Sequence, residues 1–193
     1  MMSVNVTDIR TFSSIDNSRE YFLDTNVLYW YCYPRITGKQ LSLQARPYYD
    51  FVDGLVSAGN PIVTSVYNIS ELLNVVEKHE FDIYKQEHTE ADYKIKDFRR
   101  DSTERKRMQQ NLKTTLSNVL STCKILTFDF KEEHMANFVD TLSQHRCDVF
   151  DYVILKNCIV LNHLNIITDD NDFSTIDGIK LYTANEITIN AAK

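Results

Sequence analysis

The chain has 193 residues and a formal net charge of −6, with 43% hydrophobic and 25% charged residues. This length and composition are typical of one compact domain with a full hydrophobic core. No apolar run approaches the roughly 20 residues that cross a bilayer, and the amino terminus has no apolar signal segment, so we expect a cytoplasmic protein without a membrane partner. The four cysteines show no C-x-x-C spacing, which favours free thiols over disulfides or zinc.

The amino-terminal half of the chain alternates short apolar strands with helical patterns. Residues 21–23 form the first predicted strand, and a helical pattern follows around 41–57. A second strand is predicted at 61–64. Ser65 is a good N-cap for a helix over 66–79, so the strand leads directly into this helix.

The carboxyl-terminal half continues the alternation after a polar interruption. Residues 81–121 are predicted to be mostly helical, a basic insertion that projects from the body as a helical hairpin. The remaining predicted elements are, in chain order, a strand at 124–128, helices over 131–145 and 148–163, and strands at 165–168 and 180–182. Strands that alternate with helices predict a single α/β domain over 1–193, with a central parallel sheet of four to five strands.

Positive charge concentrates in one stretch of the chain, although the chain as a whole is acidic. Residues 94–113 carry eight basic and three acidic side chains, a local charge of +5 against −11 for the rest. Such a segment is typical either of a surface that binds a polyanion or of a solvated helix with charges of both signs. The candidate RNA-binding residues are Lys94, Lys96, Arg99, Arg100, Arg105, Lys106 and Arg107.

Carboxylates follow two of the predicted strands at the point where each strand ends. Asp24 follows the first strand, and Asp169 and Asp170 follow the fourth. Because the carboxyl ends of parallel strands meet at one edge of a sheet, we expect these side chains to converge there. Packed carboxylates repel one another, and a divalent cation removes that conflict. Oxygen ligands without nearby histidine or cysteine favour Mg²⁺ or Mn²⁺ over zinc.

Neighbouring elements supply further candidate ligands, and each has an ordinary alternative. These candidates are Glu71, Asp148, Asp151 and Asp172. Glu71 lies opposite the apolar stripe expected for its helix, as a surface glutamate would. Asp148 and Asp151 share one face near a helix start, where the helix dipole favours carboxylates in any case. Asp172 is either an additional ligand or a cap. The expected stripe consists of Val66, Ile69, Leu73 and Val76.

Four short motifs resemble those of PIN domains and occur in that family's order. The run F-L-D-T-N at 22–26 resembles the opening motif, and S-E-L at 70–72 is similar to the second. D-Y-V-I at 151–154 resembles the third motif, and T-D-D-N-D-F at 168–173 resembles the fourth. The resemblance spans about residues 20–185, and its specificity comes from the four motifs occurring together in order.

This resemblance implies a three-layer α/β/α fold and a ribonuclease that depends on Mg²⁺ or Mn²⁺. The implied catalytic and metal-binding residues are Asp24, Glu71, Asp151 and Asp170. Asp151 matches the third motif better than Asp148, because apolar residues follow it directly. Asn26 and Thr168 are expected to orient the carboxylates that bind the metal.

The resemblance also implies partners. The substrate is expected to be RNA, and many bacterial members are VapC-like toxins that a small antitoxin protein neutralises and that often form homodimers. The insertion over 81–121 is longer than such compact toxins usually have, so another RNA-processing role stays open. Two further alternatives are a non-catalytic PIN-like module that recruits RNA or protein, and a structure-specific DNA nuclease served by the same carboxylates.

Overall fold

A computed structural model describes residues 5–12, 16–36, 41–88, 93–127 and 146–192. It contains one all-parallel sheet of six strands in the order β1-β6-β5-β2-β3-β4. The strands are β1 (Asn5–Asp8), β2 (Tyr21–Leu23), β3 (Ile62–Ser65), β4 (Lys124–Leu126), β5 (Asn165–Ile167) and β6 (Lys180–Thr183). The helices are α1 (Thr25–Cys32), α2 (Arg46–Ser57), α3 (Val66–Glu87), α4 (Ile95–Arg100), α5 (Ser102–Thr122), α7 (Val149–Val160), the 3-10 helix η3 (Asn171–Thr175) and α8 (Glu186–Ala191).

Both faces of the sheet are covered, because side chains alternate between two apolar clusters along each central strand. In β2, Tyr21 and Leu23 join the cluster beneath α1 and α2, whereas Phe22 joins the cluster beneath α7. In β5, Ile167 joins the cluster beneath α1 and α2, and Ile166 joins the cluster beneath α7. The structure therefore confirms the predicted three-layer α/β/α fold. All four cysteines are buried free thiols, and no described helix is long and apolar enough to span a membrane.

The sheet has one strand more than the predicted four to five. The additional strand, β1, pairs in parallel with β6 at the edge of the sheet, with Val6 opposite Leu181. Its sequence, N-V-T-D, has a single strongly apolar residue, and the strand is only partly buried. Local sequence therefore carries almost no strand signal here, and the pairing depends on the neighbouring strand.

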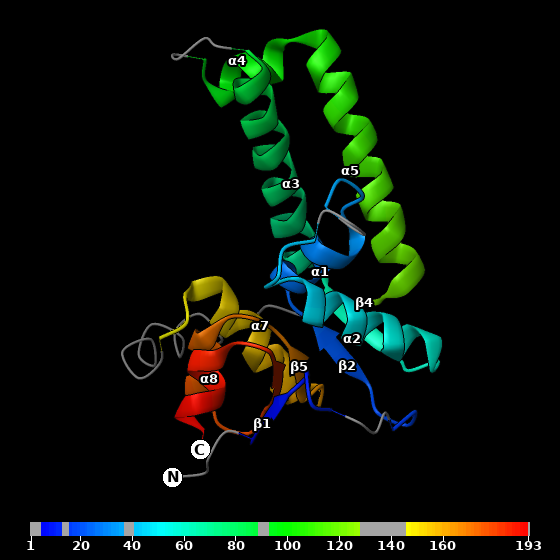
Figure 1. The fold of residues 1–193 in the computed structure, drawn as a ribbon, viewed down its shortest axis with the longest axis vertical. Coiled ribbons are helices and arrows are strands. Elements are labelled where there is room, and N and C mark those ends of the chain that lie inside the picture. The colour runs from blue at the N-terminus through cyan, green and yellow to red at the C-terminus, as the bar shows by residue number, and fades with distance from the viewer. Residues whose placement is uncertain (1–4, 13–15, 37–40, 89–92, 128–145, 193) are drawn as a thin grey trace.

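We call α3, α4 and α5 the arm. Figure 1 shows α3 and α5 side by side, rising from the sheet, with α4 at the far end. The helical insertion predicted over 81–121 lies in this arm, but α3 continues unbroken to Glu87 instead of ending near residue 79. The helix predicted over 131–145 lies outside the described residues.

The buried side of α3 differs from the expected apolar stripe. Its buried residues are Asn68, Leu72, Val76 and Glu80. Only Val76 belongs to the predicted stripe, and Val66 is exposed. The apolar pattern misleads here because two of the buried positions are polar and bond to other elements: Asn68 Nδ2 donates to Asp24 Oδ1, and Asn111 Nδ2 donates to Glu80 Oε1.

Candidate active site

Asp24 lies at the carboxyl end of β2, where its side chain caps the start of α1. The residue is buried, and both of its carboxylate oxygens accept two hydrogen bonds. Oδ1 accepts from the backbone N–H of Thr25 at 2.7 Å and from Asn68 Nδ2 at 3.2 Å. Oδ2 accepts from Asn26 Nδ2 at 3.0 Å and from Thr168 Oγ1 at 2.7 Å. The orientation of this carboxylate is therefore fixed from three different elements of the fold.

Thr168 links Asp24 to the next carboxylate. Its hydroxyl oxygen, which donates to Asp24, accepts the backbone N–H of Asp170 at 2.9 Å. Asp170 follows β5 and caps η3, with Oδ1 accepting the backbone N–H of Asp172 at 2.8 Å. The predicted orienting residues Asn26 and Thr168 thus occupy the expected places. Asp172 supplies a backbone donor to Asp170 in this arrangement.

Glu71 reaches the same place from the first turns of α3. The hydroxyl of Thr25 donates to Glu71 Oε2 at 2.6 Å, and Asn68 Nδ2 donates to that hydroxyl at 3.1 Å. Ser65, the N-cap of α3, bonds its hydroxyl to Asn68 Oδ1 at 2.5 Å. Asn68 was not among the residues expected at the site. An asparagine three residues after a capping serine is the sequence signal that could have indicated it.

The start of α7 carries the last two candidates, which differ in exposure and in hydrogen bonding. Asp148 is the N-cap, and its Oδ1 accepts the backbone N–H groups of Phe150 and Asp151 at 2.8 and 3.0 Å. Its carboxylate is therefore engaged in capping the helix and is largely exposed. Asp151, one turn into the helix, is half-buried and lies within electrostatic reach of Asp24, Asp170 and Glu71.

The electrostatics of these carboxylates follow from burial and mutual repulsion. Burial raises the pKa of Asp24 to about 6, with smaller contributions from the charges of Glu71 and Asp170. Burial and then the charge of Asp24 raise the pKa of Asp151 to about 8. Burial also raises the pKa of Asp170. We call Asp24, Glu71, Asp151 and Asp170 the acidic cup.

The donor chemistry of the acidic cup suits a hard divalent cation. In the described part of the chain, no lysine, arginine or histidine forms an ion pair with any of its four carboxylates. Oxygen donors without a protein cation are the ligands that Mg²⁺ and Mn²⁺ prefer. Among the described residues, however, no three acidic, histidine or cysteine side chains already lie close enough together to hold a metal. A bound ion therefore requires the carboxylates to approach one another more closely.

The candidate RNA-binding residues lie elsewhere. They belong to α4, the residue before it, and the first two turns of α5, at the end of the arm far from the sheet (Figure 1). Three of their guanidinium groups form ion pairs within the arm. The pairs are Arg99–Glu77 at 2.5 Å, Arg100–Asp97 at 3.7 Å, Arg107–Glu104 at 3.1 Å and Arg107–Glu87 at 3.6 Å. The structure thus brings the carboxylates together without bringing the basic residues to them.

Comparisons with known proteins place the fold. The family model described as PIN domain matches residues 21–179. No match is found among curated proteins. A solved structure with a similar fold is VapBC2 from Rickettsia felis bound to a DNA fragment from their promoter, with a TM-score of 0.52 and 19% identity. The match covers 85% of this chain and 98% of that one, so the likeness extends over the whole domain.

Proposed function

We propose that this chain, which belongs to the PIN domain family, is a metal-dependent ribonuclease that hydrolyses RNA phosphodiester bonds. The observation that carries the proposal is the acidic cup. Carboxylates from two strand ends and two helix starts converge there, and burial, with the charges of neighbouring carboxylates, raises the pKa values of Asp24, Asp151 and Asp170. Perturbed carboxylates of this kind are typical of functional sites.

Mg²⁺ or Mn²⁺ would be held by Asp24 and Asp170, with Glu71 and Asp151 completing the acidic cup directly or through water. A divalent ion supplies a water of lowered pKa and stabilises the charge that develops on the scissile phosphate. Hydrolysis forms a bond between water oxygen and phosphorus and breaks the bond from phosphorus to the ribose 3′-oxygen.

The polypeptide contributes orientation. Asn26 and Thr168 hold Oδ2 of Asp24, and Asn68 and the backbone N–H of Thr25 hold Oδ1, so the carboxylate cannot rotate without losing hydrogen bonds. The Thr25 hydroxyl holds Glu71 in the same network. Preorganised groups of this kind lower the cost of reaching the transition state.

The basic residues of the arm are proposed to bind RNA phosphates without reading sequence. Within the described residues, Lys94, Lys96 and Lys106 are exposed and have no ion pair, so they are the better candidates. Arg99 and Arg107 bind carboxylates of the arm, and their charge is partly neutralised.

We also propose that the chain is the toxin of a toxin–antitoxin module with a small antitoxin partner. The support is the fold that it shares with VapBC2, at an identity that shows the fold alone. A homodimer stays a prediction. The rival function is a non-catalytic PIN-like module, which the spacing of the carboxylates favours, since no ready-made set of three ligands is present among the described residues.

Cleavage of nucleic acid under controlled metal supply tests the function. Purified protein and Asp24→Asn are incubated with mixed RNAs or with DNA in the presence of Mg²⁺, Mn²⁺ or EDTA. We expect RNA cleavage by the wild type with metal only. Cleavage that persists in EDTA or in Asp24→Asn contradicts the metal proposal. Cleavage of DNA alone assigns the cup to a DNA nuclease, and no cleavage of either polymer favours the non-catalytic module.

A further inference from the structure

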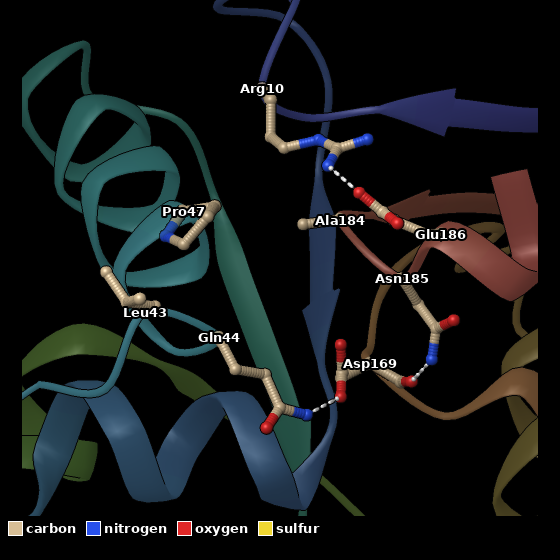
Figure 2. Close-up of a pocket in the computed structure, with 8 residues that line it drawn as sticks. All are labelled: Arg10, Leu43, Gln44, Pro47, Asp169, Ala184, Asn185 and Glu186. Atoms are coloured by element: carbon tan, nitrogen blue, oxygen red, sulfur yellow. Dashed lines mark hydrogen bonds and ion pairs between the residues drawn. The ribbon is translucent and has the colours of Figure 1, made fainter.

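A second feature lies at the carboxyl edge of the sheet, next to the acidic cup. It is a groove of about 420 Å³, within the roughly 300–1,000 Å³ of small-molecule sites. Its lining residues are Arg10, Leu43, Gln44, Pro47, Asp169, Ala184, Asn185 and Glu186. Figure 2 shows the groove between the start of α2 and the segments that follow β1 and β6.

Asp169 forms the boundary between the groove and the acidic cup. Its backbone N–H donates to Asn26 Oδ1 at 3.4 Å, on the side of the acidic cup, and the next residue in the chain is Asp170. Its side chain turns toward the groove, where Oδ2 accepts from Gln44 Nε2 at 2.5 Å. Asn185 Nδ2 donates to the Asp169 carbonyl at 2.7 Å. A polymer bound in the acidic cup can therefore continue into the groove by passing a single residue, Asp169.

The boundary is rigid, because a buried tyrosine holds it. Tyr48 donates its hydroxyl to Asp169 Oδ1 at 2.6 Å and accepts the backbone N–H of Ala184 at 2.9 Å. The same hydroxyl lies 2.9 Å from Thr183 Oγ1. The ends of β5 and β6 are thus joined through one side chain of α2. Tyr48 therefore fixes the side of the groove that Asp169 and Ala184 form.

Arg10 supplies the positive charge of the groove. Its Nε and Nη2 donate to the two carboxylate oxygens of Asp8, both at 2.9 Å, which fixes the plane of the guanidinium. Nη1 is directed toward the groove and bonds to Glu186 at 3.2 Å (Figure 2). Glu186 is 76% exposed, and an exposed ion pair of this kind contributes little, so another anion can replace the glutamate.

The remaining walls combine apolar surface with the amides of Gln44 and Asn185 and with two carboxylates, Asp169 and Glu186. The Asp169 carboxylate already accepts hydrogen bonds from Tyr48 and Gln44. Pro47, Leu43 and Ala184 provide apolar surface, and Leu43 is almost fully exposed. Of the described residues that line the groove, only Arg10 is basic. The combination of one oriented guanidinium with an apolar wall suits a nucleotide, whose phosphate is anionic and whose base has two apolar faces.

We propose that this groove binds a nucleotide that flanks the scissile phosphate of the RNA, with Arg10 on its phosphate and the base against Pro47 and Leu43. The inference rests on the proposed function for its substrate class. It goes beyond the family match, since Arg10 and the segment 184–186 lie outside the matched residues 21–179.

The test measures RNA binding and not cleavage, so it can fail separately from the nuclease proposal. All proteins carry Asp24→Asn, and the probe is a fluorescently labelled single-stranded RNA of mixed sequence, followed by anisotropy. Arg10→Ala is expected to weaken binding about three- to tenfold and to lower the slope of log Kd against log salt by about 0.7. Lys180→Ala, which removes one charge from the amino edge of the same sheet, is the matched control and should change binding less.

Glu186→Ala provides a test of opposite sign. Releasing Arg10 Nη1 should strengthen RNA binding about two- to threefold, and this gain should vanish in the Arg10→Ala background, as a double-mutant cycle measures. Asp177→Ala removes an exposed carboxylate elsewhere and should give no gain that depends on Arg10. Thermal melting of each variant checks folding.

Two results overturn the proposal. One is equal RNA affinity of Arg10→Ala and Lys180→Ala. The other is a gain from Glu186→Ala that persists without Arg10. If the Arg10 variants instead lose only a protein that co-purifies with the wild type, the groove binds protein and not RNA. Loss of RNA affinity in Arg10→Ala supports the groove even where the wild type cuts no nucleic acid.

Discussion

The acidic cup and the arm both concentrate charged side chains, but those of the arm are paired with opposite charges and those of the acidic cup are not. In the arm, basic residues that cluster in the sequence meet carboxylates of the neighbouring helix, as in the pair of Arg99 and Glu77. In the acidic cup, carboxylates from distant segments meet with no cation among the described residues, and burial raises the pKa of Asp24 and Asp151. Charged side chains that pair with opposite charges, as in the arm, are typical of structural roles. Buried carboxylates gathered without a cation, as in the acidic cup, are typical of functional sites.

The interior of the arm shows what compensation looks like when a charge is fully buried. Glu80 of α3 is 0% exposed, and its Oε1 receives Arg35 Nε at 3.1 Å and Asn111 Nδ2 at 2.7 Å. The hydroxyl of Tyr33 donates to the same oxygen. This cluster joins the end of α1 to α3 and α5, so a buried carboxylate here connects helices and needs no metal.

The largest expected effect is on catalysis in the acidic cup. Asp24→Asn removes a charge that the proposed metal requires, and we expect RNA cleavage to slow by about 10²–10³-fold or more. Thr168→Val, which removes the hydroxyl between Asp24 and Asp170, should slow it about 10–100-fold. Rates with saturating Mn²⁺ measure both. Asp177→Asn is the control, and an equal loss in that exposed position contradicts a site-specific role.

A large effect on stability is expected at the buried cluster of the arm. Glu80→Ala leaves Arg35 and Asn111 without their acceptor, and we expect a loss of about 2–3 kcal/mol in the free energy of unfolding. Arg35 is about one-third exposed, which keeps the loss below that of a fully buried pair. Urea unfolding measures it. Glu87→Ala breaks the exposed pair with Arg107 and should cost under about 1 kcal/mol. Equal losses in the two variants would contradict the distinction.

A smaller effect should appear as pH dependence of the metal-free protein. The pKa of Asp151 is raised from 3.8 to about 8 in the folded state, so its folding contribution is favourable at low pH and is lost as pH rises through this window. Asp151→Asn has no such loss. We expect the free energy of unfolding of Asp151→Asn, relative to the wild type, to rise by about 1–3 kcal/mol between pH 5 and pH 9 in EDTA. This range allows for solvent screening at a half-exposed group.

Unfolding at both pH values, with and without Mg²⁺, measures this effect. Added metal should stabilise the wild type more than Asp151→Asn at pH 9, because the ion offsets the same repulsion. A difference between the two proteins that is constant from pH 5 to pH 9 contradicts the raised pKa of Asp151.

The smallest expected effect concerns RNA binding by the arm. Replacing Lys94, Lys96 and Lys106 by alanine should weaken binding severalfold and lower the salt slope by about 2. Replacing Arg99 and Arg107 by alanine should weaken it less per residue, because carboxylates of the arm already neutralise them. Anisotropy titrations at several salt concentrations compare the two sets. Equal losses per charge mean that the ion pairs within the arm open on binding.

The acidic cup was predictable because it depends on position along strands. Asp24 and Asp170 each follow a short apolar strand, and parallel strands bring such residues to one edge. The preference for Asp151 over Asp148 came from the apolar residues that follow Asp151, and it stays a prediction, since Asp148 caps its helix as Asp24 and Asp170 cap theirs. The convergence on Asp24 thus follows from local pattern and fold class.

The residues that sequence reasoning missed depend on pairing between distant segments. Asn68 and Glu80 are polar residues on the buried side of α3, where an apolar stripe was expected, and their partners lie on α1 and α5. Strand β1 could be recognised only through its pairing with β6, and the position of Arg10, two residues after β1, depends on that pairing. A charge count over 94–113 also gave a +5 segment, because the compensating carboxylates of α3 lie outside that window.

Binding of Mn²⁺ to the wild type and to Asp24→Asn tests the central claim most directly. Electron paramagnetic resonance counts the free ion, so the measurement needs neither RNA nor activity. We expect the wild type to bind Mn²⁺ at a saturable site, Mg²⁺ to compete for it, and Asp24→Asn to bind at least about 10-fold more weakly. No saturable binding by the wild type, or equal binding by the two proteins, would contradict the assignment of the acidic cup as a metal site.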